Sequence, residues 1–123
     1  MEALAPADVR GRAALNIFLK LSHKLDLTDK ESSSLLGVSD RTFRRYRDER
    51  RPVEARDTLE RISHIANLWI KLRSIFRTET DAQRWLTSPN SAFGDHTPLQ
   101  RMLGGNVSDL IDVRYHIESA LVA

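Results

Sequence analysis

The chain has 123 residues, of which 41% are hydrophobic and 29% are charged, and its formal net charge is +2. These proportions exclude a wholly disordered chain, and the length fits one domain or two small ones that share a core. Cysteine is absent, which excludes disulfides and thiolate metal sites. Because the first residues lack the layout of a signal peptide and no apolar run reaches the length of a membrane span, we expect a cytoplasmic protein with no membrane segment.

Helical periodicity dominates the first part of the chain. Apolar residues that recur every three or four positions predict a first helix from about Pro6 to Lys24. Thr28 and Glu31 have the spacing of a capping box, so we expect a second helix to begin there. This helix is expected to end at Leu36, because Gly37 can adopt the left-handed conformation that follows many helices.

Two further helices are predicted before residue 77. Ser39 is suited to cap a third helix, with Asp40 in the first turn, where a negative charge is favourable. Pro52 is expected to end this helix and is in a position to open a fourth. A broad apolar surface predicts that the fourth helix is long and central to a small α-domain. Its apolar residues are Leu59, Ile62, Ile65, Ala66, Trp69, Leu72 and Phe76.

After Phe76 the long helical periodicity gives way to short predicted helices that are separated by turn-forming residues. Thr80 with Gln83, and Thr97 with Gln100, have the form of two more capping boxes, the second with a proline at the first helical position. A turn-rich segment lies between them, and two glycines precede a last apolar helix. The pattern predicts an all-α, small multi-helix protein. We expect a helix-turn-helix region over residues 1–77 and a compact C-terminal helical domain over residues 78–123.

The basic residues of the chain gather in one block. From Arg41 to Arg56, seven arginines against three acids leave a charge of +4. On a helix, Arg41, Arg44 and Arg45 fall within a sector of roughly 100°, and two aromatic residues lie on the opposite side. The third helix is therefore expected to be anchored by aromatic side chains and to present guanidinium groups outward.

The second helix, the Gly37 turn and the third helix have the length and spacing of a helix-turn-helix, whose second helix enters the major groove of DNA. A charged helix face can also be merely solvated. Arginine throughout the block favours DNA, since the planar guanidinium suits phosphate and guanine better than lysine does. The residues predicted to contact double-stranded DNA are Ser39, Arg41, Thr42, Arg44, Arg45, Arg47, Arg50 and Arg51.

Other chemistry finds little support in the sequence. The four histidines have no metal-ligand spacing, and no nucleophile motif or phosphate-binding glycine loop is present. We therefore predict neither an enzyme nor a cofactor or metal site. Arg114 falls inside the apolar stripe of the last helix. A structural role, in which its guanidinium ties carbonyls or an acid between the two halves, is favoured over a partner contact.

Residues 82–121 carry a spaced pattern made of Trp85, Pro89-Asn90, Phe93-Gly94, Thr97-Pro98-Leu99, Met102-Leu103, Gly105 and Val113-Arg114-Tyr115. This pattern resembles the toxin-binding domain of the Xre/MbcA/ParS antitoxin family, and residues 12–76 resemble the Xre-like region that precedes it in that family. The resemblance implies a type II antitoxin that binds a RES-domain toxin, which destroys NAD. The antitoxin would block the toxin's active site and, as a homodimer, repress its own operon. A stand-alone transcriptional regulator without a toxin, or an adaptor that has lost DNA binding, are the alternatives.

The resemblance places the toxin contacts in the last helix and the tail, at Arg114, Tyr115, Glu118, Ser119, Leu121, Val122 and Ala123. The chain departs from the family in two places: it lacks a glycine-rich ending, and Asp95-His96 follow Gly94. A RES active site that holds a dinucleotide pyrophosphate should offer cationic groups, so we expect the carboxylate of Ala123 to occupy that anion site. The competing expectation is that the last helix occludes the entrance.

Overall fold

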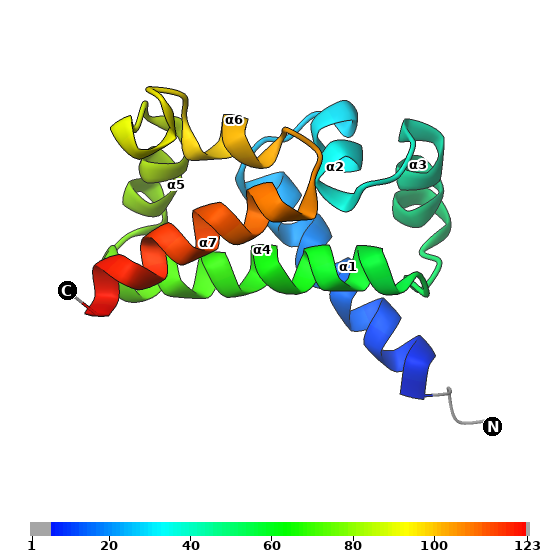
Figure 1. The fold of residues 1–123 in the computed structure, drawn as a ribbon. Coiled ribbons are helices and arrows are strands. Elements are labelled where there is room, and N and C mark those ends of the chain that lie inside the picture. The colour runs from blue at the N-terminus through cyan, green and yellow to red at the C-terminus, as the bar shows by residue number, and fades with distance from the viewer. Residues whose placement is uncertain (1–5, 123) are drawn as a thin grey trace. The chain divides into compact units, whose positions relative to one another are not determined.

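The computed structural model describes the backbone of residues 6–122 and the side chains of residues 9–120. Within this part of the chain all regular structure is helical, which confirms the predicted all-α class (Figure 1). No described helix is long and apolar enough to cross a bilayer. The elements are α1 (Pro6–Lys24), α2 (Asp29–Leu36), α3 (Asp40–Glu49), α4 (Arg56–Ile75), α5 (Glu79–Thr87), the 3-10 helix η1 (Ser91–Phe93), α6 (Pro98–Met102) and α7 (Val107–Val122).

The chain forms two compact units, Met1–Ser63 and His64–Ala123, and α4 contributes its first turns to one and its remainder to the other. The predicted domain division after residue 77 stays a prediction.

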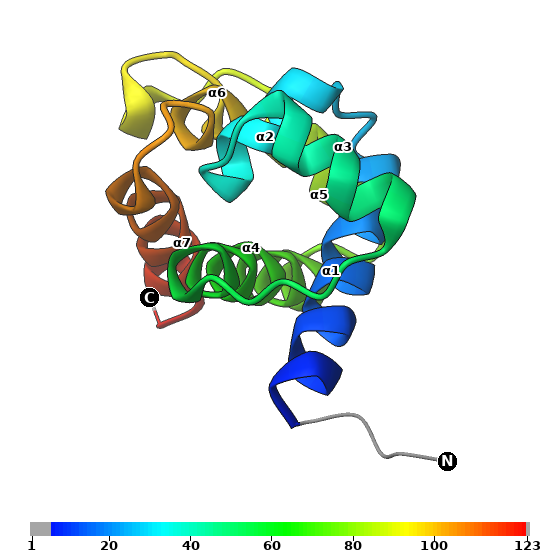
Figure 2. The ribbon, with the colours of Figure 1, turned by 90° about the vertical axis from the view of Figure 1, so that its right-hand side faces the viewer.

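Local hydrogen bonds set the start of α2, the turn after it and the start of α3 as the sequence predicts. Thr28 and Glu31 form both bonds of the capping box at the start of α2. Gly37 follows α2 with a φ of 69°, a conformation that favours glycine. The hydroxyl of Ser39 accepts from the backbone N–H of Thr42 at 3.1 Å and so caps α3. Figures 1 and 2 show α2 and α3 as two short helices joined by this tight turn.

The connection from α3 to α4 differs from the prediction. Helix α3 ends at Glu49, before Pro52, and α4 begins only at Arg56, so Pro52 does not open it. The reason lies in Val53, whose side chain is fully buried and whose N–H donates to the carbonyl of Gly11 at 3.3 Å. The segment between α3 and α4 is therefore irregular, and Pro52 and Val53 lie against α1.

The core of the first unit joins α1 to α2 and to α3. Phe18 of α1 and Phe43 of α3 are both buried, and their rings meet edge to face with centroids 6.3 Å apart. Ser32 is completely buried in α2, where its hydroxyl lies 2.8 Å from that of Ser22 in α1. This bond satisfies two polar groups that burial would otherwise leave without water.

In the second unit one predicted helix start is confirmed and one is wrong. Thr97 and Gln100 form the predicted capping box of α6, with Pro98 at its first position. Helix α5, however, begins at Glu79 and is capped by Thr78, which accepts from the N–H of Asp81 at 3.1 Å. The chain therefore enters this helix two residues before Thr80, the cap that the sequence predicted.

The core of the second unit gathers the inner faces of α4, α5 and α7. Leu72, Ala82 and Val113 are fully buried and come from these three helices in turn. The turn-rich segment between α5 and α6 contains η1 and buries Phe93. The part of α4 that belongs to this unit runs alongside α7 in both views (Figures 1 and 2).

Candidate DNA-binding and partner-binding surfaces

One face of α3 presents arginine to solvent. Arg41, Arg44 and Arg45 are exposed, whereas Phe43 between them is only 2% exposed. Among the described residues, no acidic group lies within ion-pairing distance of Arg41 or Arg44, and Arg45 pairs only loosely with Glu49 at 3.9 Å. These three guanidinium groups therefore have donors available for an external anion.

The two predicted hydroxyl contacts lie at the N-terminal end of the same helix. The hydroxyl of Ser39 caps the helix and donates to the hydroxyl of Thr42 at 3.0 Å. Ser39 is exposed and Thr42 half-buried. Since the N-terminus of a helix carries a partial positive charge, this end of α3 is favourable for a phosphate.

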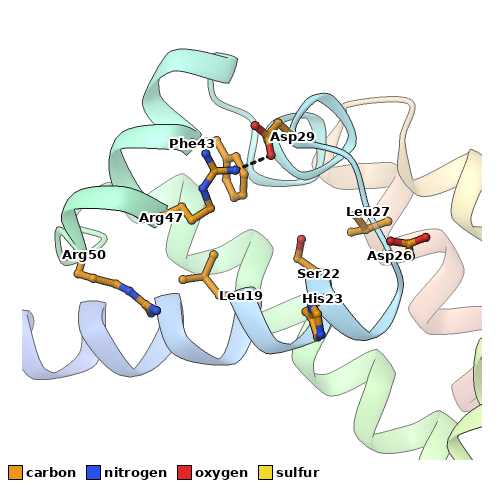
Figure 3. Close-up of a pocket in the computed structure, with 9 residues that line it drawn as sticks. All are labelled: Leu19, Ser22, His23, Asp26, Leu27, Asp29, Phe43, Arg47 and Arg50. Carbon is orange, nitrogen blue, oxygen red and sulfur yellow. Dashed lines mark hydrogen bonds and ion pairs between the residues drawn. The ribbon is translucent and has the colours of Figure 1, made fainter.

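Arg47 has different surroundings from the outward arginines. One of its nitrogens lies 2.6 Å from a carboxylate oxygen of Asp29 in α2, and its guanidinium lies over the ring of Phe43, 5.7 Å from the centroid. Its Nε donates to Asp48 at 2.9 Å. This hydrogen bond raises the pKa of Arg47 and, in turn, lowers the pKa of Asp48. Figure 3 shows the bond that joins Arg47 to Asp29 across the helix-turn-helix.

Arg50 and Arg51 follow the end of α3. Arg51 pairs with Glu49 at 2.6 Å. Arg50 adopts a left-handed conformation, its carbonyl accepts from Arg12 at 3.3 Å, and its guanidinium donates to Asn16 at 3.4 Å. Figure 3 shows the side chain of Arg50 extending along α1. The structure thus groups Arg41, Arg44 and Arg45 on one side of α3 and turns Arg47 and Arg50 toward other parts of the unit.

In the second unit, Arg114 of α7 has two partners. Its Nε donates to Glu118 on the same helix at 2.8 Å, and a terminal nitrogen lies 3.1 Å from Nδ1 of His64 on α4. Because a guanidinium can only donate, Nδ1 of His64 is the acceptor. The partners of Arg114 are therefore an acid of its own helix and a histidine, and not the carbonyls or the acid between the two halves that the sequence analysis named.

Tyr115 lies beside Arg114 and is 66% exposed. Its exposed fraction is larger than that of Ile70 (61%) or Ile75 (37%), two exposed apolar residues of the same unit. A shallow pocket of about 250 Å³ lies next to it, lined by His64, Ile111, Arg114 and Glu118 as well as by Tyr115. An exposed aromatic ring beside a pocket with a charged pair is the kind of surface that a protein partner can use as an anchor.

The remaining predicted toxin contacts continue along α7. Ser119 is exposed, and its hydroxyl donates to the carbonyl of Tyr115 at 2.8 Å. The side chains of Leu121 and Val122, and the whole of Ala123, lie outside the described residues. The structure therefore brings Arg114, Tyr115 and Glu118 together and leaves the tail open to experiment.

An aromatic cluster near Tyr115 was missed by sequence reasoning. His116 stacks on Trp85 at a centroid distance of 6.2 Å and meets the edge of Phe93 at 5.2 Å. These three residues come from α7, α5 and η1, so no local spacing in the sequence links them. Among the described residues, no group of histidines and acids could hold a metal ion.

Taken together, a helix-turn-helix whose α3 presents arginines outward and a second, separate helical unit define the chain as a two-unit helix-turn-helix protein. The family model of the antitoxin Xre-like helix-turn-helix domain matches residues 5–67, and that of the antitoxin Xre/MbcA/ParS C-terminal toxin-binding domain matches residues 71–119. The chain is also 33% identical over 108 residues to the uncharacterized protein y4oB of Sinorhizobium fredii (strain NBRC 101917 / NGR234). The aligned region covers 87% of this chain and 83% of that protein. The chain therefore belongs to the Xre/MbcA/ParS antitoxin family.

Proposed function

We propose that this antitoxin neutralises a RES-domain toxin, which degrades NAD, and that it represses its own operon as a homodimer. The observation that carries the proposal is the surface of α7, where the exposed Tyr115 stands beside the pocket of Arg114 and Glu118. This surface lies within the stretch that matches the toxin-binding family model.

The chemistry of this surface suits a tight interface. Tyrosine and arginine are enriched among residues that dominate binding energy, because each combines a large apolar area with directional donors. Glu118 and His64 already hold Arg114 in place, so little side-chain entropy is lost when a partner docks. The mechanism is occupancy: the antitoxin blocks the toxin's active site and performs no chemistry on it.

Co-expression with a RES-type toxin encoded beside the gene tests this function. Wild-type antitoxin should preserve cellular NAD and co-purify with the toxin, and Tyr115→Ala should weaken the complex by at least about 30-fold, as expected for an aromatic hot spot. Ser108→Ala, an exposed change near the start of the same helix, is the control. A Tyr115→Ala protein that protects NAD as well as wild type would contradict this role of α7.

A truncation separates the two ways of blocking the toxin. Removing residues 119–123 leaves the buried Ile117 and the Tyr115 surface in place. If residues 119–123 enter the anion site, the truncated protein should bind the toxin but fail to protect NAD. If α7 occludes the entrance, the truncated protein should still protect.

The DNA-binding part of the proposal rests on the three outward arginines of α3. A dimer that places six of them on phosphates should give operator binding whose affinity falls with salt at a log–log slope of about −5. A stand-alone regulator would show this slope without capturing a toxin. An adaptor that has lost DNA would show a flat response, and that result would remove autorepression from the proposal.

A further inference from the structure

Two adjoining pockets lie between α1 and the end of α3, on the first unit. They have volumes of about 290 and 420 Å³ and share Leu19, His23 and Arg50. Together they form what we call the α1–α3 groove, which Lys20 extends at one end and Leu27 and Asp26 at the other. Its size is within the range of small-molecule sites. Figure 3 shows most of these residues, with the side chain of Arg50 reaching along α1.

The charges around the groove favour an anion. Arg50 and Lys20 are exposed, and among the described residues neither has an acidic group within ion-pairing distance. The carboxylate of Asp29 is already paired with Arg47 at 2.6 Å. Asp26 therefore remains as the one acid of the described lining for which no pairing arginine or lysine is seen, against the cations Lys20, Lys24 and Arg50 and the exposed His23.

The backbone at Arg50 points to a use for its side chain. Arg50 has a φ of 54° and a ψ of 37° at the end of α3, a left-handed conformation that glycine adopts without penalty and that disfavours a residue with a Cβ. Asp26, at the other end of the groove, also has a φ of 54°. Non-glycine residues in such conformations gather at functional sites, where the side chain is needed in spite of the strain.

We propose that the α1–α3 groove binds a small phosphate-bearing ligand of the nucleotide class. The guanidinium of Arg50 and the ammonium of Lys20 would hold the phosphate. The half-buried Leu19 and Leu27 offer apolar surface to a flat organic body. Asp26, which would repel a bare phosphate, can accept from the hydroxyl groups of a sugar.

The position of the groove argues against the backbone of operator DNA as its occupant. The groove lies on the side of α3 that carries Phe43 and Arg47. Arg41 and Arg45 each lie roughly 160° around the helix from Phe43. A duplex held by those arginines would therefore face away from the groove, so the site is separate from the proposed operator contact.

The proposal is tested by measuring the binding of AMP to the full chain. Calorimetry gives the affinity, and the chemical shifts of the backbone amides show which residues respond. AMP should bind and should shift the amides of Lys20, His23 and Arg50, whereas inorganic phosphate and adenosine should each bind at least tenfold more weakly, since each supplies half of the contacts. A short duplex of random sequence is the competing source of phosphate. Groove signals that move with the duplex and not with AMP would overturn the proposal, as would absence of AMP binding at millimolar concentration.

Two variants test the residues. Arg50→Gly relieves the left-handed strain, so it should unfold at a temperature no lower than wild type while losing AMP affinity at least tenfold. Lys20→Gln changes only an exposed side chain and, like Arg50→Gly, should bind AMP more weakly than wild type does. Arg44→Ala, on the outward face of α3, is the control and should bind AMP as wild type does. Equal AMP affinity of Arg50→Gly and wild type would overturn the proposal.

Discussion

Arg44 and Arg47 are three residues apart on α3 but have different surroundings. Arg44 is exposed and has no described acid within ion-pairing distance, whereas Arg47 pairs with Asp29 and lies over Phe43. A phosphate contact releases counterions and shows in the salt dependence of binding, but a contact inside the protein does not. The two roles can therefore be told apart by experiment.

We expect Arg44→Ala to lower the magnitude of the salt slope of operator binding by about 1 per chain. Arg47→Gln should leave the slope unchanged and reduce the free energy of unfolding by about 0.5–1 kcal/mol, because a partly exposed ion pair and a cation–π contact are lost. Fluorescence anisotropy over a series of salt concentrations measures the first effect, and urea unfolding the second. A slope that falls equally in both variants would show that Arg47 reaches phosphate after all.

Gly11 illustrates a second residue whose role is set by its neighbours. It lies within α1, where alanine would normally be the better helix former. A Cβ at this position would collide with the backbone carbonyl of Val53 and would lie 3.1 Å from the Cβ of Pro52. Backbone cannot move away as the end of a flexible side chain can, so the missing Cβ is what allows residues 52–53 to pack on α1.

Gly11→Ala is therefore expected to lower the free energy of unfolding by about 1–2 kcal/mol, since overpacking outweighs the gain in helix propensity. Thermal and urea unfolding check this value. A variant as stable as wild type would mean that the segment at Val53 does not press on α1.

At the level of the helices, two threonines are candidates for the N-cap of α5. The pattern of Thr80 and Gln83 predicts a cap that the structure assigns to Thr78. We expect Thr78→Ala to cost about 1 kcal/mol of stability, because the N–H of Asp81 loses its acceptor. The exposed Thr80→Ala should change the free energy of unfolding by less than about 0.5 kcal/mol. Chemical denaturation of the two variants, measured side by side, decides between the caps, and a larger loss for Thr80→Ala would favour the sequence pattern.

The range of the defining interactions explains most of the helix starts that the sequence could predict. Helix α5 is the exception, because its cap at Thr78 is also local and the sequence offered Thr80 as a competing cap. The starts of α2, α3 and α6 were predictable because Thr28, Ser39 and Thr97 bond to residues three positions away. The start of α4 was not, because it depends on the burial of Val53 against a helix some forty residues earlier. Local propensity gives no weight to such a contact.

The same limit applies to the candidate sites. The outward direction of Arg41, Arg44 and Arg45 follows from helix geometry and could be predicted. The partners of Arg47 and Arg114 could not, because Asp29 and His64 lie 18 and 50 residues away in the sequence. For the same reason the arginine block looked uniform in the sequence and is divided in the structure.

On the scale of the whole molecule, the division into two compact units has a consequence for function. The outward arginines belong to one unit and the Tyr115 surface to the other. Arg41, Arg44 and Tyr115 are exposed, so replacing these side chains should not affect folding. Sites that share no side-chain partner usually behave independently. DNA binding and toxin neutralisation should therefore be separable by mutation.

The double variant Arg41→Ala/Arg44→Ala should lose operator affinity and a large part of its salt slope while protecting cellular NAD as wild type does. Tyr115→Ala should show the opposite pattern, with the slope unchanged and protection lost. Gel-shift titrations and NAD measurements on the same three proteins give both readouts. If the arginine variant also fails to protect NAD, while its unfolding temperature is that of wild type, the α3 surface must take part in binding the toxin. Neutralisation would then require both units. In that case the toxin would also compete with the operator for the same guanidinium groups.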